Sequence, residues 1–230
     1  MINQWDTYAK VFEEGMGEGG DELHTKLINP LIFKFLGVYE GKRILDAGCG
    51  NGYLVKLLSK QAKHVTGADA AKELLKLAKK RTQKITNIDY TEVNLLDPLP
   101  FAHASYEVVI ANMVLQYLPQ LATFALEAFD VLKPNGQLIV LVDHPGHALF
   151  DRAQELAGKP NPKWLTRASY FTSGQRRKKS LWDKAVLEYY HRPVQEYINV
   201  FTPYFKLEKI AELTSDSETP RILGFLWSKI

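Results

Sequence analysis

Three glycines, Gly48, Gly50 and Gly52, form the pattern in this sequence with the clearest chemical meaning. They follow an apolar run at residues 43–47 and precede a helical pattern, so a strand, a glycine loop and a helix are expected in that order. Glycines at such a junction let a ligand approach the backbone, and the N–H groups of a helix start can bind an anion. The alternative is a tight turn that binds nothing. Asp46 ends the strand, where a carboxylate suits an ammonium-bearing ligand better than a pyrophosphate.

A second carboxylate helps to choose between ligand classes. Asp69 ends the next apolar run, where a carboxylate can accept both ribose hydroxyls of a nucleotide. A dinucleotide fingerprint needs a third glycine at the position that Tyr53 occupies. The spacing therefore favours an adenosine-containing ligand, and Asp46 favours S-adenosylmethionine over NAD.

Apolar runs and helical patterns alternate along residues 43–142, which predicts βαβ units. Strands are expected at residues 43–47, 64–68, 88–93, 106–111 and 137–142. Helices are expected at residues 53–60 and 71–81. A third helix is expected to have Pro119 in its first turn and an apolar face that ends at Leu132. Such alternation builds a parallel sheet covered on both faces, with right-handed connections.

Three other segments depart from this alternation. Residues 1–35 look helical around a glycine-rich break at residues 15–20. Residues 144–200 are richer in aromatic and basic residues, with helical stretches at 149–157, 185–190 and 194–201 and no expected strand. Apolar runs at residues 205–210 and 221–227 predict a hairpin, so one strand should run antiparallel to the rest of the sheet.

Length and composition restrict the class of protein. The 230 residues suit one domain, and no apolar run reaches the roughly 18 residues of a membrane span. The first residues lack the pattern of a secretory signal. Cys49 is the one cysteine, which excludes an intramolecular disulfide and a multi-cysteine zinc site and fits a cytoplasmic setting. A net charge of +3 does not indicate a nucleic-acid partner.

Five stretches together make the chain resemble the class I S-adenosylmethionine-dependent methyltransferases that act on small molecules. Residues 44–52 match the first motif of that family, and residues 65–69 with the following helix match the second. Residues 94–101 resemble the stretch around the adenine, and residues 106–118 resemble the segment beneath the transferable methyl group. Residues 131–138 match the turn before the fifth strand. The N-terminal segment, residues 143–145 and residues 190–193 with Tyr197 further resemble some uncharacterised bacterial members.

The resemblance implies the fold and its division. The fold is α/β: a doubly wound, Rossmann-like, seven-stranded and mostly parallel sheet with one antiparallel strand, helices on both faces and a helical cap insertion. A single domain is expected. Its parts are an N-terminal helical cap or lid (1–40), a cofactor-binding core (41–142), a substrate-cap insertion (143–202) and a C-terminal β-hairpin (203–230).

The resemblance also implies S-adenosylmethionine as the cofactor, S-adenosylhomocysteine as its product, and no metal. The three glycines should line the methionine part, and Asp46 should orient its amino group. Asp69 should bind the ribose, and Asn94 should meet the adenine amino group, with Asp97 as the alternative. The implied cofactor-binding residues are Asp46, Gly48, Cys49, Gly50, Gly52, Asp69, Ala70, Asn94, Leu95, Asn112 and Met113.

Methyl transfer from a sulfonium depends mainly on alignment, and a base is needed only where the acceptor must lose a proton. His144, after the fifth strand, and His191, in the insertion, are the candidate catalytic residues, although each can instead be a structural histidine. The other histidines, His24 among them, are assigned no role. The basic run at residues 176–179 is more typical of a solvated loop than of an RNA contact. Aromatic residues of the insertion, including Trp182, either wall a substrate pocket or pack within the insertion.

These residues predict methyl transfer to an oxygen or nitrogen of a small-molecule acceptor. Three alternatives stay open: the same fold acting on RNA or protein, a non-catalytic protein that binds an adenosine ligand, and a nicotinamide oxidoreductase. Tyr53 and Asp46 disfavour the last. No pattern indicates a membrane partner or an oligomeric state.

Overall fold

The computed structural model describes residues 2–147, 170–179, 182–183, 185–215 and 219–230. The alternation predicted for the middle of the chain is confirmed. In chain order the elements are β1 (Arg43–Ala47), α3 (Tyr53–Leu58), β2 (His64–Asp69), α4 (Lys72–Arg81), β3 (Ile88–Glu92), β4 (Tyr106–Asn112), η2 (Leu115–Tyr117), α5 (Ala122–Val131) and β5 (Leu132–Asp143). One detail is wrong: Pro119 lies before the helix, because α5 begins only at Ala122.

The strands form one seven-stranded sheet in the order β3-β2-β1-β4-β5-β9-β8. The first five strands pair in parallel. The predicted hairpin is present as β8 (Phe205–Leu213) and β9 (Ile222–Lys229), and β9 lies antiparallel between β5 and β8. The strand order reverses between β1 and β4, and ligands of such sheets bind at the carboxyl ends of the strands beside this point.

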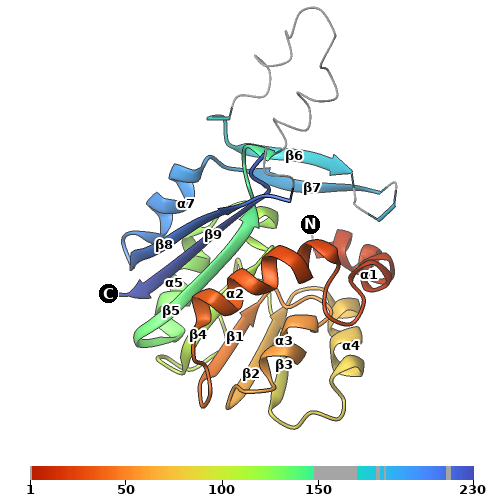
Figure 1. The fold of residues 1–230 in the computed structure, drawn as a ribbon, viewed down its shortest axis with the longest axis vertical. Helices are drawn as coiled ribbons and strands as arrows, with labels where there is room; N and C mark the ends of the chain where they lie inside the picture. The colour runs from red at the N-terminus through yellow and green to blue at the C-terminus, as the bar shows by residue number, and fades with distance from the viewer. Residues whose placement is uncertain (1, 148–169, 180–181, 184, 216–218) are drawn as a thin grey trace, which may run out of the picture.

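Helices cover both faces of the sheet (Figure 1). Alternate residues of β4 point to opposite faces, so Val108 and Ile110 belong to one apolar cluster while Val109 and Ala111 belong to the other. One cluster includes residues of α2 (Asn29–Leu36) and α3, and the other includes residues of α5 and α7 (Val194–Phe201). The doubly wound fold predicted from the sequence is therefore confirmed.

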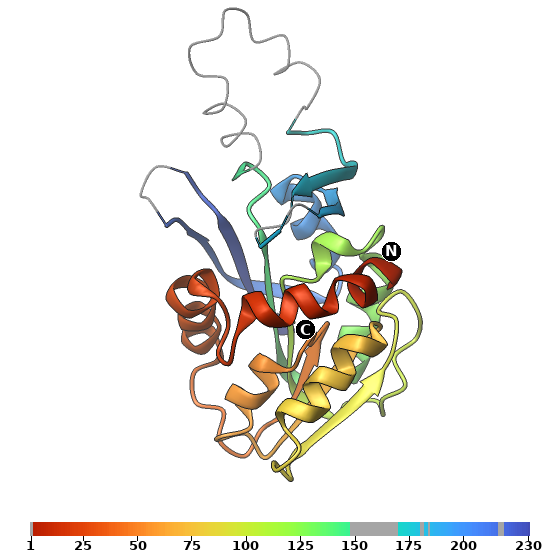
Figure 2. The same cartoon turned by 90° about the vertical axis from the view of Figure 1, so that its right-hand side faces the viewer.

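The N-terminal segment is helical with a glycine break, as predicted. It consists of α1 (Ile2–Met16), a turn in which Gly17 and Gly20 have φ values of 60° and 98°, a π-helical turn η1 (His24–Ile28), and α2. Figure 2 shows α1 passing across the ends of the strands, below the hairpin of the insertion. This helix therefore lies over the edge at which a ligand is expected.

The insertion differs from its prediction. Its described part holds a separate two-stranded antiparallel sheet, β6 (Gly174–Lys179) and β7 (Val186–His191), so the expectation of no strand is wrong. The helix expected at residues 185–190 is strand β7, because Leu187, Tyr189 and His191 alternate toward the buried side. The cap is thus partly a β-hairpin, while the helix predicted at 194–201 is confirmed as α7. The helix expected at residues 149–157 lies outside the described residues.

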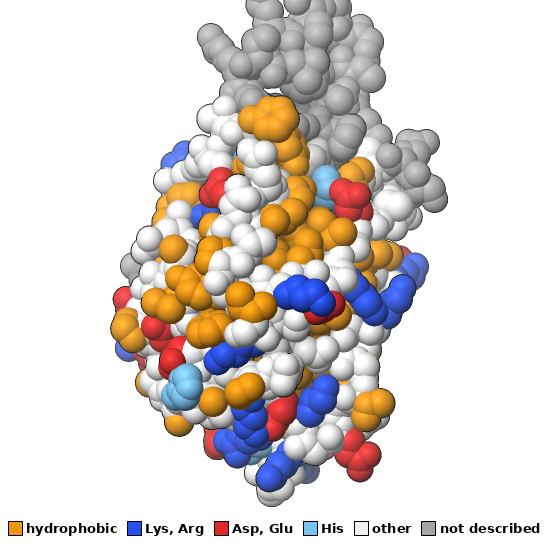
Figure 3. Space-filling model, turned by 90° about the vertical axis from the view of Figure 1, so that its left-hand side faces the viewer, with side chains coloured by type: hydrophobic (Ala, Val, Ile, Leu, Met, Phe, Trp, Pro, Cys, Tyr) orange, Lys and Arg blue, Asp and Glu red, His pale blue; other side chains and the backbone are white. Residues whose placement is uncertain are grey.

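The edge strand β8 exposes charged side chains, including Lys206, Glu208 and Lys209, which discourage pairing with another sheet. On the face to which α7 and β8 contribute, Lys and Arg side chains lie among Asp, Glu and hydrophobic ones (Figure 3). A membrane-crossing helix, one long and apolar enough for the task, is not found in the described part of the chain.

Candidate functional site

A cavity of about 390 Å³ opens at the carboxyl edge of the sheet. Asp46, Asp69, Asn112 and Asp143, near or at the ends of β1, β2, β4 and β5, all line it. Its volume lies in the usual range of small-molecule sites. The parallel arrangement of these strands explains why polar residues far apart in the sequence meet here.

The glycine loop forms one wall of this cavity. Gly48 and Gly50 have φ values of 81° and 53°, which favour glycine, and both line the cavity. A Cβ at Gly48 would lie 2.4 Å from Val114, so this position is also sterically restricted. Gly52 caps α3 with a φ of 72°, but a Cβ there would face Tyr90 and Ala78. Gly52 therefore shapes the loop from outside and does not line the cavity.

Asp46 is a carboxylate of the site that is buried without hydrogen-bond compensation from the described chain. It is 1% exposed, and neither carboxylate oxygen has a hydrogen-bond partner among the described residues. Burial, and secondly the charge of Asp69, raise the pKa of Asp46 to about 8. A buried carboxylate without a partner is costly, so a ligand with a cationic N–H donor would relieve it.

Asp69 ties the glycine loop to the start of α4. One of its carboxylate oxygens accepts the Gly50 N–H at 2.8 Å, and the other accepts the Ala71 N–H at 2.8 Å. Burial raises the pKa of Asp69 although these hydrogen bonds oppose the rise. Because a carboxylate oxygen has two lone pairs, Asp69 can accept further hydrogen bonds from a ligand in the cavity.

The remaining predicted cofactor residues also lie around this cavity. Cys49, Ala70, Asn94, Leu95, Asn112 and Met113 all line it, whereas Asp97 does not. The Asn112 amide donates to the Tyr53 hydroxyl at 2.9 Å, and its own oxygen is buried without a partner among the described residues. Burial raises the pKa of the Cys49 thiol well above its ordinary value, which makes a thiolate nucleophile untenable there.

Neither of the two predicted catalytic histidines lines the cavity. His144 Nε2 lies 2.7 Å from Glu212, and its Nδ1 accepts the Gly146 N–H at 3.0 Å. His191 Nε2 lies 2.8 Å from the carbonyl oxygen of Tyr170. Both rings are buried, and their hydrogen bonds join them to other parts of the fold. Their positions therefore do not support a direct role in the chemistry of the cavity.

Several lining residues were not assigned from the sequence. The helix α1 contributes Trp5, Tyr8, Phe12 and Met16 to the wall, and the segment after it contributes Asp21 and His24. A tertiary contact, not a motif, places them there. The one available signal is the clustering of aromatic residues at helical spacing in α1.

The insertion completes the wall with Lys178, Trp182 and Leu187. Lys178 pairs with Asp143 and lies over the rings of Tyr117 and Tyr189, at 5.3 and 5.5 Å from their centroids. Burial opposes its charge, yet Asp143 holds the pKa of Lys178 above its ordinary value. The basic run at residues 176–179 is therefore a strand with one lysine turned into the site, not a solvated loop.

No group of three or more potential metal ligands occurs among the residues that the structure describes. The chemistry that the arrangement offers is the binding of a small molecule with a cationic and a hydroxyl-rich part. Asp46 can bind the cationic part and Asp69 the hydroxyl groups, and aromatic side chains line the same cavity.

A sequence model of the methyltransferase domain family matches residues 45–140. This range runs from β1 through most of β5 and contains the glycine loop, Asp46 and Asp69. The matched segment thus supplies the core of the cavity, whereas α1 and the hairpin of the insertion lie outside it.

Curated relatives match over part of their length. A demethylmenaquinone methyltransferase of Tropheryma whipplei is 32% identical over 49% of this chain and 46% of that protein. A ubiquinone biosynthesis O-methyltransferase of Hydrogenovibrio crunogenus is 31% identical over 59% of this chain and 56% of that protein. The chain therefore spans about half the length of these relatives.

The fold is similar to that of a candidate S-adenosylmethionine-dependent methyltransferase from Listeria monocytogenes, solved by crystallography. The TM-score is 0.73 at 23% identity, over 87% of this chain and 96% of the other. At that identity the likeness concerns the fold alone.

Proposed function

Because this chain belongs to the class I S-adenosylmethionine-dependent methyltransferases, we propose that it transfers the methyl group of S-adenosylmethionine to an oxygen or nitrogen of a small molecule. The observation that carries the proposal is Asp46. Its carboxylate is 1% exposed, has no partner among the described residues, and faces the cavity beside Gly48 and Gly50. The α-ammonium group of the cofactor's methionine part supplies the donors that this carboxylate lacks.

The other cofactor contacts follow from the same wall. Asp69 accepts the ribose hydroxyls with the lone pairs that the Gly50 and Ala71 N–H groups leave free. Asn94 and Leu95, which follow β3, border the adenine, with Ala70 nearby along the same wall. Asn112 and Met113 flank the region of the sulfonium. Met113 is held there with a φ of 55°, and its N–H donates to Leu141 at 2.8 Å.

The bound cofactor supplies an electrophilic methyl group on a sulfonium, which is already a good leaving group. The chain's residues supply binding, orientation and exclusion of water. Alignment of two reactants in one cavity accounts for roughly 7–11 kcal/mol of a barrier in favourable cases. The carboxylates of Asp46 and Asp69 favour the sulfonium group of S-adenosylmethionine over the neutral thioether group of S-adenosylhomocysteine.

The acceptor end of the cavity is formed by the N-terminal cap and the insertion. The side-chain amide of Gln4 in α1 donates to the carbonyl oxygen of Glu188 in β7 at 3.1 Å and accepts the Glu188 N–H at 3.0 Å. These two segments therefore cover the site together. Trp5, Phe12 and Trp182 make this part apolar and aromatic. The enclosure supports a small acceptor rather than RNA or a protein, and it supports a cap role for residues 1–40 and 143–202.

The proposal is tested by following methyl-labelled S-adenosylmethionine. The purified chain is incubated with three acceptor pools: small metabolites, total RNA and total protein. Label is expected in the small-molecule pool only, with formation of S-adenosylhomocysteine. Asp69→Ala should lower this transfer at least tenfold, whereas Asp97→Ala, outside the cavity, should leave it unchanged. Label in RNA or protein, or none in any pool, would contradict the proposal.

A further inference from the structure

One imidazole lines the cavity among the residues that the structure describes, and it belongs to His24. His24 is the first residue of the π-helical turn η1 and is 8% exposed. Short π-helical turns are rare and occur frequently at functional sites. The side chain shares the cavity with Asp46 and the glycine loop, which His144 and His191 do not reach.

Asp21 determines which nitrogen of this ring carries a proton. Its Oδ1 lies 2.7 Å from His24 Nδ1 and accepts the His24 backbone N–H at 2.9 Å. Burial opposes the charge of Asp21, but the hydrogen bonds from His24 hold the pKa of this carboxyl below its ordinary value. A carboxylate only accepts, so the hydrogen is on Nδ1 and the neutral ring keeps its lone pair on Nε2. Nε2 has no hydrogen-bond partner in the described part of the chain.

The surrounding residues hold this ring in place. The rings of His24 and Tyr53 meet edge to face, with centroids 5.4 Å apart. The Tyr53 hydroxyl donates to Asn29 at 3.2 Å and accepts from Asn112 at 2.9 Å, so Tyr53 is itself fixed. A Cβ at Gly20, whose φ is 98°, would lie 2.5 Å from His24 Cβ. Gly20 therefore leaves the space that the imidazole occupies.

The wall near α1 indicates the kind of acceptor. Trp5 meets Phe12 and Tyr117 edge to face, at 5.6 and 4.8 Å between centroids, and Phe12 meets Trp182 at 5.4 Å. A wall of rings is suited to an aromatic acceptor. Such an acceptor must carry its reactive oxygen toward a group that can remove a proton.

We propose that His24 is the base of the reaction, that Asp21 is its positioning residue, and that the acceptor is an aromatic ring bearing a hydroxyl group. The inference rests on the proposed function. The acceptor O–H bond breaks and its proton moves to His24 Nε2. The electron pair left on oxygen forms the new bond to the methyl carbon, and the pair of the carbon–sulfur bond stays on sulfur. The Asp21 carboxylate stabilises the imidazolium that results.

The first test measures the ring directly and needs no reaction. Two-bond ¹H–¹⁵N correlations report which nitrogen of each neutral imidazole is protonated. His24 should carry its hydrogen on Nδ1. His144 should show the opposite tautomer, because its Nδ1 accepts the Gly146 N–H. Asp21→Asn should reduce the Nδ1-protonated form of His24. A neutral His24 protonated on Nε2 would overturn the proposal.

The second test compares two probes, phenol and 4-nitrophenol, as methyl acceptors. Phenol ionises near pH 10, so it needs a base at neutral pH, whereas 4-nitrophenol already supplies its phenolate. His24→Asn should slow methylation of phenol about a hundredfold and that of 4-nitrophenol less than tenfold. His103→Asn is the matched control, because His103 Nδ1 makes a similar pair with Asp130, at 2.8 Å, at an exposed site.

Calorimetry with S-adenosylhomocysteine separates this proposal from the proposed function. His24→Asn should bind it within twofold of the unchanged chain. If the unchanged chain binds it but methylates neither phenol, or if His24→Asn slows both probes equally, the base proposal fails and cofactor binding stands. If the unchanged chain does not bind it, the proposed function fails, and with it the role given to His24.

Discussion

Asp46 and Asp69 lie at the ends of adjacent parallel strands, β1 and β2, and their charges affect each other. Asp69 compensates its burial with N–H donors from the glycine loop and α4. Asp46 has no such donors among the described residues, so burial keeps it largely protonated at neutral pH. The residue that is least stable as a carboxylate in the free chain is thus the one that gains most from a cationic ligand.

The pH dependence of cofactor binding should report on Asp46. Its pKa of about 8 means that binding an ammonium group at pH 7 must ionise the carboxyl and release a proton. The affinity for S-adenosylhomocysteine should therefore rise between pH 6 and 8, by up to about tenfold per pH unit. Calorimetry in buffers with different ionisation enthalpies counts the released proton. Asp46→Asn should bind more weakly with no such dependence. A flat affinity for the unchanged chain would contradict this role.

At the residue scale, the sequence was most informative where a side chain follows directly from a strand end. Asp46 and Asp69 could be placed in one site because parallel strands share their carboxyl edge. His24 could not, because its position depends on how η1 packs against Tyr53. His144 follows a strand end too, but its ring pairs with Glu212 of β8, a contact between segments far apart in the chain.

At the scale of elements, strands with apolar runs were predictable and the hairpin of the insertion was not. β6 consists of Gly174, Gln175 and four basic residues, so it carries no alternation of apolar and polar residues. It is a strand because it pairs with β7, residue by residue from Gly174 with His191 to Lys179 with Val186. The hydrogen-bonded pairing with β7, and not a local sequence pattern, therefore makes this segment a strand.

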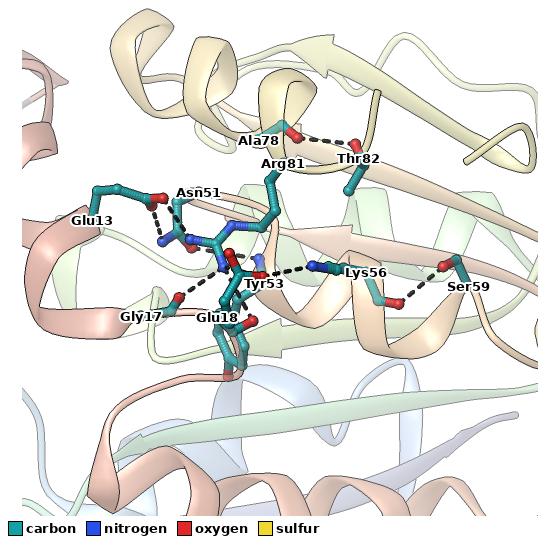
Figure 4. A network of polar contacts seen from close by, with 10 residues as sticks. All are labelled: Glu13, Gly17, Glu18, Asn51, Tyr53, Lys56, Ser59, Ala78, Arg81 and Thr82. Atoms are coloured by element: carbon teal, nitrogen blue, oxygen red, sulfur yellow. Dashed lines mark hydrogen bonds and ion pairs between the residues drawn. The ribbon is translucent and has the colours of Figure 1, made fainter. Parts of the chain in front are cut away.

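The helix α1 depends on Arg81 of α4 for its position. The Arg81 side chain is 4% exposed, and it donates to Glu13 at 2.6 Å and to the Gly17 carbonyl at 2.7 Å. Glu13 also accepts from Asn51 of the glycine loop at 2.5 Å. Figure 4 shows how this network joins the end of α1, the loop and α4. One buried cation therefore holds the cap against the cofactor wall.

Arg81→Ala should release α1. Loss of a buried cation leaves Glu13 without its cationic partner, so the free energy of unfolding should fall by about 2–4 kcal/mol. Amide hydrogen exchange in α1 should speed up more than in β4. Arg177→Ala removes an exposed pair with Glu188 and should change stability by less than about 0.5 kcal/mol. Equal exchange rates in α1 of the unchanged chain and Arg81→Ala would contradict this role.

At the scale of the whole molecule, the cavity exists because three separate parts of the chain meet above one sheet edge. The parallel core supplies the carboxylates and glycines, α1 supplies aromatic rings, and the hairpin β6–β7 supplies Lys178 and Leu187. Figure 2 shows the order of these layers, with α1 between the core and the hairpin. Covering the sheet edge in this way limits the access of water to a reaction that depends on alignment.

Calorimetric titration of the whole chain with S-adenosylhomocysteine and with NAD measures directly which of the two ligands the cavity binds. We expect micromolar binding of S-adenosylhomocysteine, no binding of NAD, and a roughly tenfold to hundredfold loss in Asp69→Ala, the effect of removing hydrogen bonds to a charged group. Asp97→Ala should bind as the unchanged chain does. Binding of NAD instead, or an affinity for S-adenosylhomocysteine that Asp69→Ala leaves intact, would contradict a cofactor site built on Asp46, Asp69 and the glycine loop.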